Sequence, residues 1–91
     1  MRGQRAQAGL ACGMDFDQEI DARSLLCPLP VLKARKRLKG MGPGQVLKLV
    51  ADDPAAVIDV PHFCAEQGYS LLDVITADHG VRCYFINKPG T

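Results

Sequence analysis

A cysteine followed by two prolines at alternate positions, Cys27-Pro28-Leu29-Pro30, stands directly before a basic amphipathic run that ends at Gly40. Proline is favoured in the first turn of a helix, because its missing N–H would have no acceptor within the helix there. The element therefore predicts a helix that begins near Pro28, with Cys27 at or beside the N-cap. A helix start stabilises a thiolate and lowers the pKa of a cysteine from about 8.5 toward neutrality. Cys27 is thus the candidate reactive residue, and Pro28 and Pro30 support it by stiffening its loop.

Along this helix, apolar residues recur at spacings of three and four and form one stripe: Val31, Ala34, Leu38 and Met41. The opposite, solvated face carries Lys33, Lys36 and Arg37. Five basic residues and no acidic residue lie between Lys33 and Lys39, although the net charge of the chain is only +1. A local basic patch on a nearly neutral protein favours a docking surface for a partner protein over general polyanion binding. We therefore expect no direct nucleic-acid binding, with a merely solvated helix face as the alternative.

Four strands are predicted from short apolar runs, over residues 16–20, 46–51, 70–76 and 81–87. The last two are separated by the tight turn Asp78-His79-Gly80 and should pair as a hairpin. The element order is then βαβαββ. This order predicts an α+β fold, a two-layer α/β sandwich in which a four-stranded mixed sheet carries both helices on one face.

The second helical region is complicated by Pro61, which cannot continue a helical hydrogen-bond ladder. Asp53 is expected as an N-cap before Pro54. The sequence predicts one helical turn over residues 55–58, then a new helix that is capped by Asp59 and ends at Gly68.

The length of 91 residues indicates a single domain, which we place at residues 14–89 after a disordered tail over residues 1–13. The cysteines form no C-x-x-C pair and no paired spacing with a histidine, so no metal site is expected. No secretory signal or membrane segment is visible, which favours a cytoplasmic protein with reduced thiols. Cys12 is read as incidental, and Cys64 and Cys83 as core residues.

Several elements together resemble the TusA/SirA/YedF sulfur-carrier family: Cys27-Pro28-Leu29-Pro30, Asp21-Ala22-Arg23, Met41-x-Pro43-Gly44, Asp52-Asp53-Pro54-Ala55-Ala56, Asp59-Val60-Pro61 and Gly68-Tyr69. The resemblance covers roughly residues 15–88 in unbroken order. One position departs from it. The family commonly has glycine directly after the arginine that precedes the cysteine loop, whereas this chain has Ser24.

The resemblance implies that Cys27 carries sulfane sulfur as a persulfide, with no other cofactor. It further implies a cysteine desulfurase or rhodanese-like protein as the sulfur donor and a downstream protein as the acceptor. The pathway would be 2-thiouridine formation in tRNA or dissimilatory sulfur transfer. A monomer free to visit several partners is the expected state. The alternative is a non-catalytic regulatory or RNA- or protein-binding module of the same fold.

Overall fold

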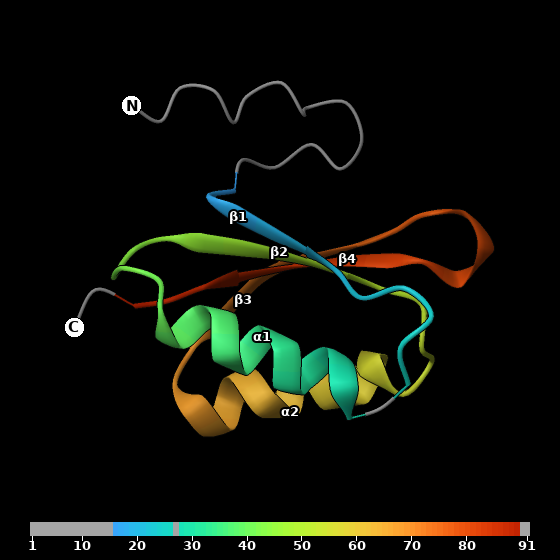
Figure 1. The fold of residues 1–91 in the computed structure, drawn as a ribbon, viewed down its shortest axis with the longest axis horizontal. Coiled ribbons are helices and arrows are strands. Elements are labelled where there is room, and N and C mark those ends of the chain that lie inside the picture. The colour runs from blue at the N-terminus through green and yellow to red at the C-terminus, as the bar shows by residue number, and fades with distance from the viewer. Residues whose placement is uncertain (1–15, 27, 90–91) are drawn as a thin grey trace.

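The computed structural model describes residues 16–26 and 28–89, so Cys27, Cys12 and the proposed tail over residues 1–13 lie outside the described residues. Four strands form one mixed sheet: β1 (Gln18–Asp21), β2 (Val46–Ala51), β3 (Ser70–Thr76) and β4 (Arg82–Asn87). The sheet order is β1-β2-β4-β3, in which β1 and β2 are parallel and the other neighbours are antiparallel. The helices α1 (Leu29–Lys39) and α2 (Ala56–Gln67) cover one face of this sheet (Figure 1). The predicted two-layer α+β sandwich is confirmed.

The main core lies between the helices and the two central strands. Ala34 and Leu38 of α1 are fully buried, and Met41 just beyond the helix is nearly so, which confirms the predicted apolar stripe. The strands contribute alternate residues to the same core: Leu47, Leu49, Tyr84 and Ile86. Each aliphatic side chain fully buried in this way contributes about 1.5–3 kcal/mol. Cys64 also lies in this core, whereas Cys83 is buried on the other face of the sheet, so both cysteines pack as predicted.

The first strand begins later than the sequence predicted. Residue 17 forms a bend, and β1 spans Gln18–Asp21 instead of residues 16–20. Asp17 is bonded to Val46 twice, because its N–H donates to the Val46 carbonyl at 2.8 Å and its Oδ2 accepts from the Val46 N–H at 2.8 Å. Just before the bend, Phe16 packs against the smaller hydrophobic cluster on the sheet face opposite the helices. Its ring centroid lies 5.1 Å from Lys48 Nζ.

The second helix differs from the prediction of two separate segments, because α2 is continuous and Pro61 lies inside it. The missing hydrogen bond of Pro61 would reach the carbonyl of Val57, and both residues are exposed. Water can therefore solvate the carbonyl, so the proline does not end the helix. Asp59 lies in the first turn and is not a second cap. Ala55 takes the N-cap position in place of Asp53, whose Oδ1 accepts a hydrogen bond from the Ala55 N–H at 3.2 Å.

The remaining element boundaries follow the sequence closely. Gly68 ends α2 with φ +80°, a conformation that favours glycine, and its N–H donates to the Cys64 carbonyl. The strands β3 and β4 form the predicted hairpin, joined by the short 3₁₀ turn Asp78–Gly80. No helix in the described part of the chain is long and apolar enough to cross a membrane.

Candidate functional site

The segment that leads to the candidate cysteine is held by side chains from two of the sequence motifs. The Arg23 guanidinium donates to both carboxylate oxygens of Asp21, at 2.9 and 2.8 Å. This pairing, together with a hydrogen bond from the Arg23 N–H, lowers the pKa of Asp21 to about 2. The next residue, Ser24, is tied to the loop before α2, because its N–H donates to Asp52 Oδ1 at 2.9 Å. The motif residues thus fix the path of the chain just before Cys27.

Ser24 occupies a backbone conformation that normally belongs to glycine. Its φ is +73°, and the Leu25 N–H donates to the Ala22 carbonyl at 3.2 Å, which closes a four-residue turn with Ser24 at its third position. A type II turn requires positive φ there and favours glycine. The conformation therefore explains why a glycine suits this position in the family pattern. It also shows that serine adopts the same turn at a cost in strain.

The two prolines occupy different places at the start of α1. Pro28 is the N-cap residue, directly before the first helical residue Leu29 as the sequence indicated, and it is exposed. Pro30 is the second helical residue and is fully buried against the start of α2, beside Asp53, Ala56 and Asp59. Both prolines line the small cavity between the two helix starts, but only Pro30 is buried there. The prediction that Cys27 lies at or beside the N-cap concerns a residue outside the described ranges.

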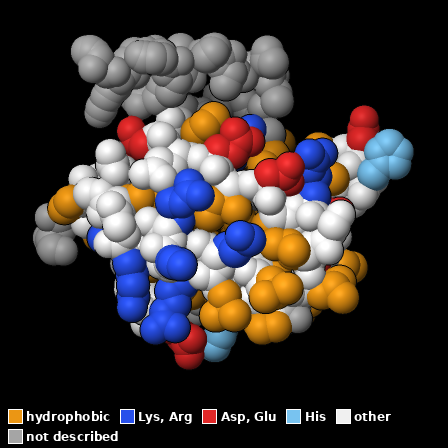
Figure 2. All heavy atoms as spheres, viewed as in Figure 1, with side chains coloured by type: hydrophobic (Ala, Val, Ile, Leu, Met, Phe, Trp, Pro, Cys, Tyr) orange, Lys and Arg blue, Asp and Glu red, His pale blue; other side chains and the backbone are white. Residues whose placement is uncertain are grey.

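Exposed apolar side chains gather at this end of the helical layer. Leu26 and Ile58 are 69% and 74% exposed, and Leu29, Leu32 and Val57 are exposed as well. Both helices begin at the same end of the molecule (Figure 1), and Figure 2 shows hydrophobic side chains concentrated there. The sequence analysis missed this surface, because Leu29 and Leu32 resemble ordinary helix residues and the position of Ile58 depended on the course of α2.

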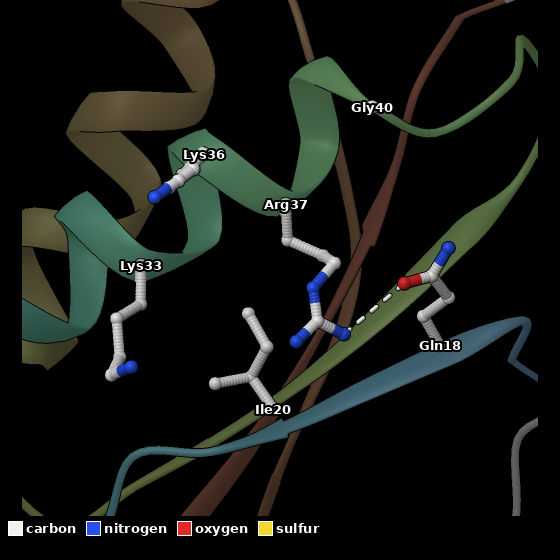
Figure 3. Close-up of a pocket in the computed structure, with 6 residues that line it drawn as sticks. All are labelled: Gln18, Ile20, Lys33, Lys36, Arg37 and Gly40. Carbon is white, nitrogen blue, oxygen red and sulfur yellow. Dashed lines mark hydrogen bonds between the residues drawn. The ribbon is translucent and has the colours of Figure 1, made fainter.

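The three predicted docking residues come together at a second place, a groove between α1 and β1. This groove has a volume of about 480 Å³ and is lined by Lys33, Lys36, Arg37 and Gly40 from the α1 segment and by Gln18 and Ile20 from β1. Figure 3 shows Arg37 reaching from α1 toward β1, where its Nη1 donates to Gln18 Oε1 at 3.1 Å. The contribution of β1 could not be read from the sequence, since only the sheet pairing brings it beside α1.

The other candidate chemical groups are not assembled into a site. Among the described residues, no group of three or more His, Cys, Asp or Glu side chains could hold a metal ion. Burial raises the pKa of the Cys64 thiol to about 11, so this thiol is protonated and poorly reactive at neutral pH. His62 lies within α2 and is exposed, with its Nε2 3.3 Å from Glu66 Oε2. Among the described residues, neither Cys64 nor His62 therefore forms part of a second assembled site.

Comparison with known proteins supports the resemblance found in the motifs. The family described as Sulfurtransferase TusA matches residues 18–88. The chain is 43% identical over 74 residues to the sulfur carrier protein TusA of Allochromatium vinosum, and the match covers 81% of this chain and 95% of that relative.

The fold has a counterpart of known structure. The crystal structure of a SirA-like protein from Desulfitobacterium hafniense superimposes with a TM-score of 0.72 at 27% sequence identity, and the match covers 79% of this chain and 97% of that protein. Sequence motifs, family match and fold therefore agree, and the chain belongs to the TusA family.

Proposed function

We propose that this protein is a sulfur carrier that accepts sulfane sulfur on Cys27 and passes it to another protein. The observation that carries the proposal is the Cys27-Pro28-Leu29-Pro30 element, in a chain 43% identical to a named sulfur carrier over nearly the whole length of that relative. The described neighbours Leu26 and Pro28 are both exposed, which suits a thiol that must enter the site of a partner.

The chemistry needs only one thiol on the carrier. The Cys27 thiolate attacks the outer sulfur of a donor persulfide, the S–S bond of the donor breaks, and the donor cysteine leaves as a thiolate. A new S–S bond forms on Cys27, so the sulfane sulfur moves without net oxidation or reduction. The second transfer repeats the step with Cys27 as the leaving group. No bound cofactor or metal is required, since the sulfur is held covalently.

The start of α1 favours a thiolate of moderate stability. Pro30 has no N–H, and the Leu29 N–H already donates to the Leu26 carbonyl at 2.8 Å, so few backbone donors remain for a bound anion. The helix dipole then acts without a full set of hydrogen bonds. This balance suits a carrier, because a strongly stabilised thiolate is a weaker nucleophile.

The proposal extends to partners, docking residues and location. The donor is a cysteine desulfurase or a rhodanese-like protein, and the acceptor is a downstream protein of tRNA 2-thiouridine synthesis or of dissimilatory sulfur transfer. Lys33, Lys36 and Arg37 form part of the docking surface. The carrier works as a monomer that is free to visit several partners. It works in the cytoplasm, because a persulfide relay needs free thiols.

The test is sulfur loading followed by mass spectrometry. The protein is incubated with a cysteine desulfurase, pyridoxal phosphate and cysteine, and we expect an added mass of one sulfur atom, located on Cys27 and removed by reductant. Cys27→Ala should abolish loading and leave the circular dichroism spectrum unchanged, whereas Cys64→Ser should still load. An unchanged mass, or sulfur located on Cys64 or Cys83, would contradict the proposal.

A further inference from the structure

The groove between α1 and β1 concentrates positive charge that no carboxylate of the described residues neutralises. Three of its six lining residues are cations, and none is acidic or aromatic. Among residues 16–26 and 28–89, no ion pair forms with Lys33, Lys36 or Arg37. The three positive charges therefore face the groove without carboxylate partners from the described chain.

Arg37 is held in place within this groove. Its Nη1 bond to Gln18 Oε1 spans from the helix to the edge strand β1, and Ile20 lies beside the guanidinium (Figure 3). A guanidinium carries five N–H donors in a planar fork, so the other nitrogen atoms remain available to a ligand. The fork matches a carboxylate with two parallel hydrogen bonds, and fixing its position beforehand reduces the entropy lost on binding.

The groove lies close to the proposed transfer site but does not coincide with it. With a rise of about 1.5 Å per residue, Lys33 and Arg37 lie about 6 and 12 Å along α1 from Leu29. An occupant of the groove would therefore leave the start of α1 open. Figure 2 shows the same separation, with basic side chains over one part of the helical layer and hydrophobic side chains over its other end.

We propose that this groove binds a carboxylate-rich segment of a partner protein and holds that partner beside Cys27. The function of the contact rests on the proposed sulfur transfer, because the partner would then present its own reactive sulfur at the start of α1. Binding of one segment raises the effective concentration of the rest of the partner, and opposite charges speed the encounter. Single-stranded RNA fits less well, since stacking of bases needs aromatic side chains and the groove has none.

The test uses a fluorescein-labelled peptide of six glutamates and a labelled uridine oligonucleotide of similar charge, with fluorescence anisotropy as the readout. We expect the peptide to bind the full chain more tightly than the RNA in about 50 mM salt, and binding to weaken as salt rises. The triple variant Lys33→Glu, Lys36→Glu and Arg37→Glu should weaken peptide binding by about tenfold or more.

A matched control separates the groove from net charge. The triple variant Arg35→Glu, Lys39→Glu and Arg82→Glu changes the charge equally, and none of its positions lines the groove. This control should keep more of the peptide affinity than the groove variant. Equal losses in the two triple variants, tighter binding of the RNA, or no peptide binding at all would each overturn the proposal.

A further variant separates this proposal from the carrier function. Cys27→Ser should bind the peptide as the wild type does, and inorganic polysulfide should load Cys27 of the wild type. Failure of polysulfide to load Cys27 of the wild type would refute the carrier function but not the groove proposal. Loss of peptide binding in Cys27→Ser would refute an independent groove.

Discussion

Ser24→Gly should stabilise this protein, because the position requires a backbone conformation that a side chain opposes. Ser24 has φ +73° at the third position of the turn before Cys27. The N–H bond to Asp52 Oδ1 uses the backbone of residue 24, so glycine retains it. The substitution thus removes the contacts of Cβ with its own backbone and leaves the anchoring hydrogen bond in place.

The expected magnitude follows from two opposing effects. A left-handed conformation costs a residue with Cβ roughly 1–2 kcal/mol. Glycine at a surface position is more flexible in the unfolded chain, which offsets about 0.4–1 kcal/mol of that gain. The two ranges leave a net increase of about 0–1.6 kcal/mol in the free energy of unfolding, with a central value of about 0.8 kcal/mol. For a chain of this length, the central value raises Tm by about 3–6 °C.

The assay is equilibrium unfolding in guanidinium chloride, followed by circular dichroism, with thermal unfolding as a second measurement. The denaturation midpoint should rise while the slope of free energy against denaturant stays the same. Ser24→Ala is the control for the hydroxyl, because it keeps Cβ and should bring no stabilisation. Gly68→Ala is the reverse experiment, since Gly68 has φ +80° in open space and should lose about 1 kcal/mol.

Two results would refute this reasoning. A lower midpoint for Ser24→Gly would mean that the unfolded-state entropy of glycine outweighs the strain at residue 24. An equal rise for Ser24→Ala would assign the effect to the hydroxyl instead of to φ.

Three further predictions concern charge and thiol chemistry. Lys88→Met should lower the free energy of unfolding, measured by urea titration, by about 1–2 kcal/mol. Lys88 Nζ donates to the carbonyls of Leu38, Lys39 and Met41 at the end of α1, at 3.0, 3.4 and 2.9 Å. An unchanged free energy of unfolding would contradict a stabilising role for these hydrogen bonds. In Asp21→Asn, the difference in free energy of unfolding from the wild type should be constant above about pH 5 and shrink as pH falls toward 2. Pairing with Arg23 lowers the pKa of Asp21 to about 2, so the wild type loses the stabilising pair only when the carboxylate is protonated. A difference independent of pH would refute this prediction. Iodoacetamide at pH 8 should modify Cys27 in the native protein and spare Cys64 and Cys83, which peptide mapping can measure. Cys64 and Cys83 are both buried, and the pKa of Cys64 is raised to about 11. Labelling of Cys64 as fast as Cys27 would contradict this packing.

Local sequence patterns determined most of the architecture. The stripe of α1 followed from the spacing of Ala34, Leu38 and Met41, because helical periodicity places such residues on one face. Gly68 and the turn at Asp78–Gly80 marked the ends of α2 and β3 through backbone conformations that few residues adopt easily. The chemistry assigned to Cys27 also came from the sequence, since it depends on residue types at adjacent positions.

Tertiary structure decided what depends on residues distant in the chain. Pro61 remains inside α2 at a place where both it and Val57, four residues earlier, are exposed, and this exposure is set by how the helix packs. The sequence showed only that Ser24 replaces a glycine. The strain at this position became visible from its φ of +73° and from the hydrogen bond of its N–H to Asp52, 28 residues away. The groove exists because β1 pairs in parallel with β2 and lies beside α1, where Gln18 meets Arg37. A sequence pattern specifies local conformation and faces, whereas the partner of each face is settled only when the whole chain packs.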